Sequence, residues 1–142
     1  MRTKLFVTIE SQRPGTLKEV KARWDVECIL RNGKTVKRSA WISLENASVK
    51  RAALEALKEG LSIFNRATTM TVIIEEPTTR SILINGWLTK WVRNNFTKKN
   101  GEIANADLWK QIATLISPHY VTYLYGRSLE IEIERIKEES WH

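Results

Sequence analysis

The chain has 142 residues, of which 42% are hydrophobic, and 23 Lys+Arg against 16 Asp+Glu give it a formal net charge of +7. This length and composition suit one folded domain, residues 1–142, and exclude a disordered chain. No apolar run approaches the roughly 20 residues of a membrane-spanning helix, and Met1–Lys4 lacks the apolar region of a signal peptide. The single cysteine, Cys28, excludes an internal disulfide and a multi-cysteine zinc site. We therefore expect a soluble, cytoplasmic protein with no membrane partner.

The charged residues are uneven in kind and in position. Only two of the 16 acids are aspartates, Asp25 and Asp107, which disfavours a mechanism built on several catalytic aspartates. Residues 1–43 hold ten basic and four acidic side chains, and residues 80–110 hold six and two. Two basic blocks of this kind indicate binding to phosphate backbones, with a solvated protein surface as the equally good alternative.

Three strands are predicted at the start of the chain. Apolar and polar residues alternate from Lys4 to Glu10 and again from Val20 to Leu30, which is typical of strands with one buried face. Asn32-Gly33 is a strong hairpin signal between the second run and a return strand from Thr35 to Ser43. These segments predict an antiparallel start to a sheet.

The rest of the chain shows helical and strand patterns in turn. Apolar residues recur at three- and four-residue spacing from Ala53 to Phe64, which predicts a helix. The elements expected after it are, in order, a strand over 71–75, a helix capped by Thr78 or Thr79 and continuing to about Asn94, a loop over 95–105, a helix over 108–116, a strand over 121–125 and a final helix over 128–140. In the final segment Ile131 and Ile133, at a spacing of two, also fit a strand. One mixed sheet with helices packed on it is the simplest architecture for this order.

One segment carries a more specific pattern of aromatic and basic residues. Trp87 and Trp91 lead to Phe96-Thr-Lys-Lys-Asn-Gly, and Asn105-Ala-Asp-Leu-Trp follows. This arrangement resembles the bacterial type 1 ribonuclease H family, and the specific match covers residues 53–125. The resemblance implies an α/β, ribonuclease H-like fold. Such a fold has a five-stranded mixed sheet, with three antiparallel strands and then parallel additions, and helices on both faces.

The resemblance also implies a chemistry, in which two magnesium ions about 4 Å apart are held by four acids and hydrolyse a phosphodiester. It places Glu10, Glu76 and Glu134 at three of the four acid positions, as candidate catalytic residues and ligands of Mg²⁺ or Mn²⁺. The fourth position falls on Val49 or Asn46, neither of which supplies a carboxylate. All three acids are lengthened from aspartate to glutamate, and Mg²⁺ tolerates displaced ligands poorly. The alternative is that three of the 14 glutamates fall near these positions by chance, with Glu75-Glu76 simply favouring the N-terminus of the helix that follows.

The nucleic-acid-binding residues of the family are better preserved than its acids. The resemblance assigns seven residues to this surface: the groove aromatics Trp87, Trp91 and Phe96, the basic-loop residues Lys98, Lys99 and Asn105, and Asn46 as the counterpart of asparagines that read RNA 2′-hydroxyls. Aromatic rings pack on sugars, while cationic and amide groups meet phosphates. For the two helical tryptophans, core packing at a spacing of four is the equally good alternative.

We therefore expect a ribonuclease H-like domain that binds a nucleic-acid duplex, preferably an RNA–DNA hybrid, with hydrolysis lost or strongly reduced and no cofactor. The first alternative is an active hybrid endoribonuclease that uses Glu10, Glu76 and Glu134 with Mg²⁺ or Mn²⁺. The second alternative is a protein-interaction module that uses the fold as a scaffold for a partner protein.

Overall fold

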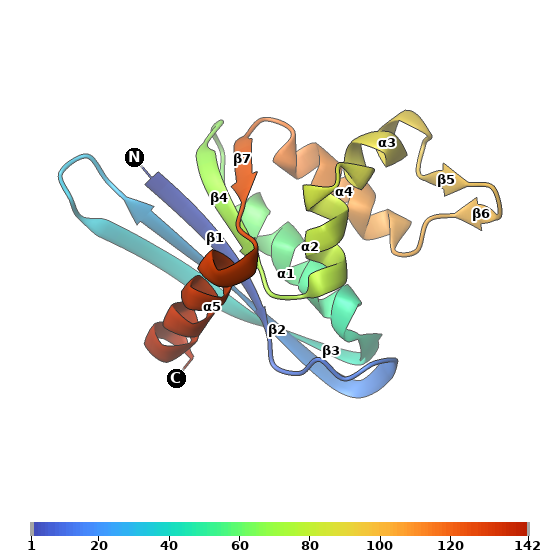
Figure 1. Cartoon of the computed structure of the whole chain (residues 1–142), viewed down its shortest axis with the longest axis horizontal. Coiled ribbons are helices and arrows are strands. Elements are labelled where there is room, and N and C mark those ends of the chain that lie inside the picture. Colours follow the sequence, from blue (N-terminus) through green and yellow to red (C-terminus); the bar gives the residue numbers. More distant parts are fainter. Residues whose placement is uncertain (1, 142) are drawn as a thin grey trace.

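The structure of the chain, a computed structural model, describes residues 2–141. Its centre is a five-stranded sheet in the order β3-β2-β1-β4-β7 (Figure 1). The strands are β1 Arg2–Ile9, β2 Thr16–Ile29, β3 Thr35–Ser48, β4 Thr69–Ile74 and β7 Tyr120–Tyr123. β2 is antiparallel to both β1 and β3, whereas β4 joins β1 in parallel and β7 joins β4 in parallel. The predicted mixed sheet, with three antiparallel strands and parallel additions, is confirmed.

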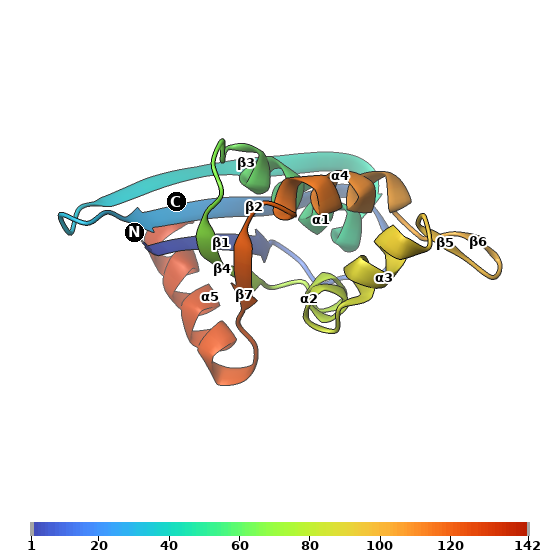
Figure 2. The same ribbon diagram turned by 90° about the horizontal axis from the view of Figure 1, so that it is seen from above.

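Within residues 2–141, five helices and one small hairpin complete the fold. They are α1 Val49–Ser62, α2 Pro77–Ile84, α3 Trp87–Arg93, the hairpin strands β5 Thr97–Lys98 and β6 Gly101–Glu102, α4 Ala106–Ile116 and α5 Gly126–Ser140. α1 and α4 lie on one side of the sheet and α5 lies on the other (Figures 1 and 2). None of the helices in the described part of the chain is long and apolar enough to cross a membrane.

Alternation along the strands separates two cores. Leu5 and Val7 of β1 join the larger core with α1, whereas Phe6 between them joins the smaller core with α5. Successive side chains of a strand point to opposite faces of the sheet, which explains this division. Gly60 of α1 lies so close to the sheet that an added Cβ would come within 2.8 Å of Leu5 Cδ1. The missing side chain therefore allows α1 to pack directly on the sheet.

The segment predicted as one helix after Pro77 is two helices. The N-cap of α2 is Glu76, whose side chain accepts hydrogen bonds from the backbone N–H groups of Thr78 and Thr79, so the predicted threonine cap is wrong. After α2, Gly86 takes a left-handed conformation (φ 75°) and α3 begins. Glycine adopts that conformation without a steric penalty, and α3 leaves at an angle to α2 (Figure 1).

The structure differs from the predicted elements in three other places. β2 and β3 each run for 14 residues, beyond the alternating patterns that predicted them. The predicted loop over 95–105 contains the β5–β6 hairpin. The final segment is the helix α5, so the strand alternative suggested by Ile131 and Ile133 is wrong. Ile133 packs in the small core against the sheet, whereas Ile131 is 53% exposed.

Candidate nucleic-acid interface

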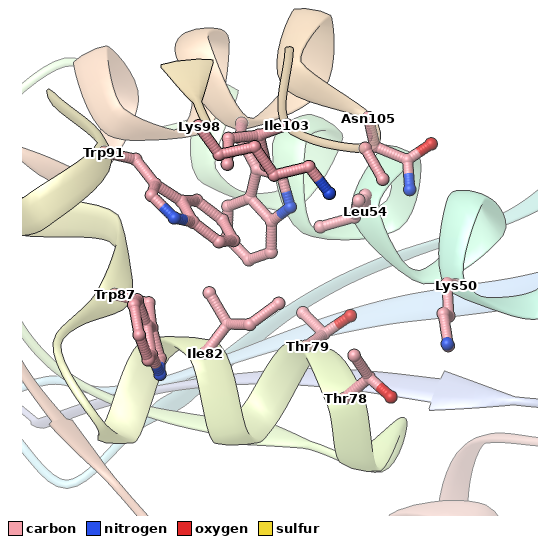
Figure 3. Close-up of a pocket in the computed structure, with 12 residues that line it drawn as sticks. Lys50, Leu54, Thr78, Thr79, Ile82, Trp87, Trp91, Lys98, Ile103 and Asn105 are labelled. Atoms are coloured by element: carbon pink, nitrogen blue, oxygen red, sulfur yellow. The ribbon is translucent and has the colours of Figure 1, made fainter. Parts of the chain in front are cut away.

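A cavity of about 460 Å³ opens between α1, α2, α3 and the segment that precedes α4 (Figure 3). We call it the aromatic cavity. Four of the seven predicted binding residues line it: Trp87, Trp91, Lys98 and Asn105. The other walls come from Lys50, Leu54, Thr78, Thr79, Ile82, Ile103, Ala104 and Trp109. Three indole rings and two lysines thus share one cavity.

The three tryptophans of this cavity differ in exposure. Trp109 is 2% exposed and meets Trp91 edge-on, with ring centroids 5.6 Å apart. Trp87 is 46% exposed, and Lys90 Nζ lies 4.6 Å from the centre of its ring. Trp109 is therefore a core residue, whereas the ring of Trp87 lies at the surface.

The β5–β6 hairpin carries the predicted basic residues. Lys98 lines the aromatic cavity, and Lys99 is exposed at the turn. Phe96, which precedes the hairpin, is 6% exposed and belongs to the larger core, so its ring lies inside the protein and does not line the cavity. Its left-handed backbone (φ 59°) turns the chain, and its carbonyl accepts a hydrogen bond from Ile103 N–H at 3.0 Å. Phe96 therefore anchors the hairpin to the core.

Arg51 connects α1 to the start of α4 beside the cavity. Asn105, with a left-handed backbone (φ 59°), accepts a hydrogen bond from Arg51 Nη1 at 3.3 Å. Arg51 also donates two hydrogen bonds to Asp107, at 2.8 and 2.6 Å, and these lower the pKa of the Asp107 carboxyl to about 2. Sequence reasoning missed Arg51 and Lys50 as site residues, because the apolar pattern that predicted this helix begins after them, at Ala53.

Two further hollows continue from the aromatic cavity toward α5. The second hollow, of about 440 Å³, shares Lys50 and Thr78 with the aromatic cavity. The third hollow, of about 530 Å³, shares Gln12 and Pro77 with the second and ends at α5. Neighbouring hollows of this series share lining residues, and we call the three together the groove. It runs from α3, past the first turns of α1 and α2, to α5.

The three predicted acids lie in different places. Glu134 of α5 is exposed and lines the third hollow. Glu76 lines the second hollow, but it is 4% exposed and both its carboxylate oxygens bind α2. Oε1 accepts from the N–H and O–H of Thr79, and Oε2 accepts from the N–H of Thr78. Glu10 lines a separate hollow beside β2 and β3. Each acid thus lines a different hollow.

The side chains at the family's metal positions do not fit a pair of magnesium ions. Val49 is 6% exposed and belongs to the larger core, and the alternative, Asn46, is an exposed residue with a left-handed backbone (φ 51°). Across residues 2–141, no three His, Cys, Asp or Glu side chains gather closely enough to hold a metal ion. Mg²⁺ needs near-octahedral oxygen ligands at about 2 Å, and these residues do not supply them.

Sequence reasoning missed three charged residues of the third hollow. Glu75, Arg80 and Lys137 line it together with Glu134. The pair Glu75-Glu76 is visible in the sequence, but the family resemblance implied only the second member as a site residue. The register of β4 decides which of the two turns toward α5, and Lys137 bonds Glu75.

Curated proteins that resemble the chain are ribonucleases H. One from Hydrogenovibrio crunogenus is 30% identical over 113 residues, which are 78% of this chain and 77% of that protein. The chain belongs to the ribonuclease H family. A ribonuclease H from Chlorobium luteolum is 40% identical over 74 residues, and one from a Thermoanaerobacter species is 30% identical over 81 residues. The matches cover 50% and 56% of this chain, and the chain spans about half the length of these two relatives, 44% and 52%. No protein-family model matches the chain.

Solved structures place the chain in the same fold. The crystal structure of LC9-RNase H1, a type 1 RNase H with the type 2 active-site motif, has a TM-score of 0.75 at 17% identity, over 97% of this chain and 69% of that chain. The foamy viral protease-reverse transcriptase in complex with RNA/DNA hybrid has a TM-score of 0.63 at 10% identity, over 94% of this chain and 18% of that chain. These identities establish the fold alone. The expected ribonuclease H-like fold is confirmed.

Proposed function

We propose that this member of the ribonuclease H family binds a nucleic-acid duplex, preferably an RNA–DNA hybrid, and that hydrolysis is lost or strongly reduced. The main support is a contrast within the site. The aromatic cavity gathers four of the predicted binding residues, whereas the three predicted acids, Glu10, Glu76 and Glu134, line three different hollows. Four predicted binding residues thus share one cavity, whereas no two of the predicted acids share a hollow.

The aromatic cavity suits the sugar–phosphate backbone of a bound strand. Trp87 offers the apolar face of an exposed indole to a sugar, and Lys50 and Lys98 supply positive charge for the neighbouring phosphates. The foamy viral protein was solved with an RNA/DNA hybrid and with dsDNA. That protein shares the fold of this chain, which supports a duplex as the partner.

Residues around the cavity extend the proposed surface. Lys99 at the hairpin turn and the half-buried amide of Asn105 lie beside the aromatic residues, and Phe96 contributes by anchoring the hairpin from inside. Asn46, exposed three residues before α1, is the proposed contact for an RNA 2′-hydroxyl. A contact to that hydroxyl is what distinguishes RNA from DNA at a given position.

Reduced hydrolysis is inferred from the positions of the acids. Two-metal hydrolysis needs carboxylates that converge on ions about 4 Å apart. Glu76 already binds the first turn of α2 with both oxygens, and Glu10 lines a hollow outside the groove. Of the three, Glu134 alone is an exposed side chain in the groove. One carboxylate does not hold two metal ions.

Lys98→Ala and Lys99→Ala should each weaken hybrid binding and flatten its dependence on salt. A lysine that meets a phosphate contributes about 0.9 to the slope of log affinity against log salt concentration. Fluorescence anisotropy of a labelled hybrid at several salt concentrations measures both quantities. Arg66→Ala is the matched control, because Arg66 is exposed and precedes β4 at the end of that strand away from the groove. An unchanged slope in both lysine variants would remove the hairpin from the interface.

The two alternative functions predict different results. An active hybrid endoribonuclease using Glu10, Glu76 and Glu134 with Mg²⁺ or Mn²⁺ would cleave the RNA strand, and Glu134→Gln would abolish cleavage. Glu134→Gln is a better control than Glu76→Gln, because Glu76 also caps α2. A protein-interaction module would show no salt-dependent duplex binding.

A further inference from the structure

The third hollow of the groove contains two protein cations beside Glu134, one of the three acids that the family resemblance implies as metal ligands. It lies between the end of β4, the start of α2 and the exposed side of α5. Its polar and charged lining residues are Gln12, Glu75, Arg80, Glu130, Glu134 and Lys137. The two cations, Arg80 and Lys137, are both held in place by hydrogen bonds.

Lys137 forms a short ion pair with Glu75. Its Nζ donates to Glu75 Oε2 at 2.6 Å and lies 4.6 Å from the ring centre of Trp141. The other carboxylate oxygen, Oε1, accepts the backbone N–H of Ile9 at 2.8 Å. The Glu75 side chain is 14% exposed. Both of its oxygens therefore have protein partners, and the positive charge beside it comes from the chain itself.

Arg80 is a fixed cation without a carboxylate partner. Its Nη1 donates to the carbonyl oxygens of Ile74 and Glu75, at 3.0 and 3.1 Å. Among the residues that the structure describes, it forms no ion pair. A guanidinium has five N–H donors in a planar fork that matches two oxygens of a phosphate. One nitrogen of Arg80 holds the backbone, and among the described residues the other two form no hydrogen bond.

We propose that the third hollow holds a backbone phosphate of the bound duplex on Arg80 and Lys137, with no divalent metal ion. This inference rests on the proposed function and deepens it, because the hollow is the end of the same groove. Arg80 supplies the positive charge and the planar donors, and Lys137, whose charge is paired with Glu75, supplies its remaining N–H donors. Glu130 and Glu134 line the same hollow as exposed carboxylates. Their like charge opposes the phosphate and limits its affinity.

The first test compares hybrid binding by the full chain in EDTA and in MgCl₂ at matched ionic strength. Fluorescence anisotropy of a labelled RNA–DNA hybrid gives the two dissociation constants. We expect them to agree within about twofold, because fixed protein cations provide the contact. Binding that requires Mg²⁺ would overturn this inference and leave the proposed function standing. No binding in either buffer would overturn both.

The second test removes the planar guanidinium of Arg80. Arg80→Ala should weaken binding in EDTA about tenfold, the loss of a charge-assisted hydrogen bond, and should lower the salt slope by about 0.9. Arg80→Lys keeps the charge and loses the fork, so it should weaken binding less and keep the slope. Arg66→Ala, at the opposite end of β4, should change neither quantity. Wild-type affinity in Arg80→Ala would overturn the proposal, and thermal unfolding of each variant shows that folded proteins are compared.

The third test asks whether Glu134→Gln tightens or weakens duplex binding. Glu134→Gln removes a like charge next to the proposed phosphate, so binding should tighten by about twofold. If Glu134 were instead a ligand of a metal ion that holds the duplex, the same change would weaken binding in MgCl₂. Weaker binding by Glu134→Gln would therefore overturn the proposal.

Discussion

At the scale of single residues, neighbouring carboxylates of this chain have different partners. Glu75 and Glu76 are adjacent, yet Glu75 bonds Lys137 of α5 while Glu76 caps α2. Consecutive side chains at the end of a strand point to opposite sides, so only one of the two can turn toward α5. The cap supplies acceptors for two of the N–H groups that a helix N-terminus leaves without intrahelical partners.

Glu76→Ala should destabilise the fold by about 1 kcal/mol, because the N–H groups of Thr78 and Thr79 lose their acceptor. Urea unfolding followed by circular dichroism measures the change in unfolding free energy. Glu134→Ala, on an exposed part of α5, is the control and should stay within about 0.5 kcal/mol of the wild type. Equal stability of Glu76→Ala and the wild type would exclude the cap and return Glu76 to the candidate metal ligands.

The Arg51–Asp107 pair makes a pH-dependent contribution to stability. Hydrogen bonds from Arg51 lower the pKa of Asp107 from its ordinary value of 3.8 to about 2. A lowered folded-state pKa means that the contribution is present above the ordinary value and is lost as the pH falls through the folded value. The Asp107 side chain is 59% exposed, so solvent screening keeps the contribution below about 1 kcal/mol. Asp107→Asn should lower Tm slightly at pH 6 and not near pH 2, and an equal loss at both pH values would contradict the assignment.

At the scale of elements, α5 is attached to the sheet by a small apolar core and by charge. The core is built on Phe6 and Ile73 of the sheet. Beside it, Arg135 donates hydrogen bonds to both carboxylate oxygens of Glu27 on β2, at 2.8 and 3.0 Å. Burial acts to raise the pKa of Glu27, but the bonds and charge of Arg135 outweigh it and the pKa is lowered. This pair holds α5, and therefore Lys137, at the third hollow.

Arg135→Met should destabilise the fold by about 3 kcal/mol at pH 7, because Glu27, which is 9% exposed, is left without its main partner. Urea unfolding at several pH values and low ionic strength measures the loss, since an ionic denaturant would screen the pair. The difference from the wild type should shrink below the ordinary Glu27 pKa of 4.5, where protonation removes the attraction. Arg127→Met, at the exposed start of α5, is the matched control. If Arg135→Met and Arg127→Met lost the same unfolding free energy, the pairing with Glu27 would not be what holds α5 on the sheet.

The strands could be predicted from the sequence better than the helix boundaries. Alternation reports directly on burial of one face, and it located β1 and β2. The turn signal Asn32-Gly33 located the hairpin and the return strand β3. The break at Gly86 could not be predicted, because a glycine inside a helical pattern is tolerated and its left-handed conformation depends on packing elsewhere. The same holds for Phe96, whose burial depends on how the hairpin folds back on the core.

For the candidate site too, the residues that could be predicted are those close together along the chain. Trp87, Trp91, Lys98 and Asn105 come from one segment, and the motif that joins them could be recognised in the sequence. The third hollow joins residues that are far apart, such as Arg80 on α2 and Lys137 on α5. Residue types alone do not show that two such cations will meet, because their contact depends on how α5 docks on the sheet.

At the scale of the whole molecule, the two basic blocks of the sequence lie in different places. The β5–β6 hairpin and the turn between β2 and β3 lie at opposite ends of the longest axis (Figure 1). The block over residues 80–110 borders the groove, where Arg80 and Lys98 line it. Of the first block, Arg13 lines the second hollow, whereas Arg31 and Lys34 lie at the distant turn. Net charge alone therefore overestimates the surface available to the duplex.

Incubation of the purified chain with an end-labelled RNA–DNA hybrid, with Mg²⁺ and Mn²⁺ in parallel, tests the proposed function most directly. Half of each sample is analysed for cleavage of the RNA strand and half for a gel shift, with Glu134→Gln as control. We predict a salt-dependent shift and no more cleavage than in the control. RNA cleavage by the wild type that is absent from Glu134→Gln would contradict the proposal and make this chain a working hybrid endoribonuclease.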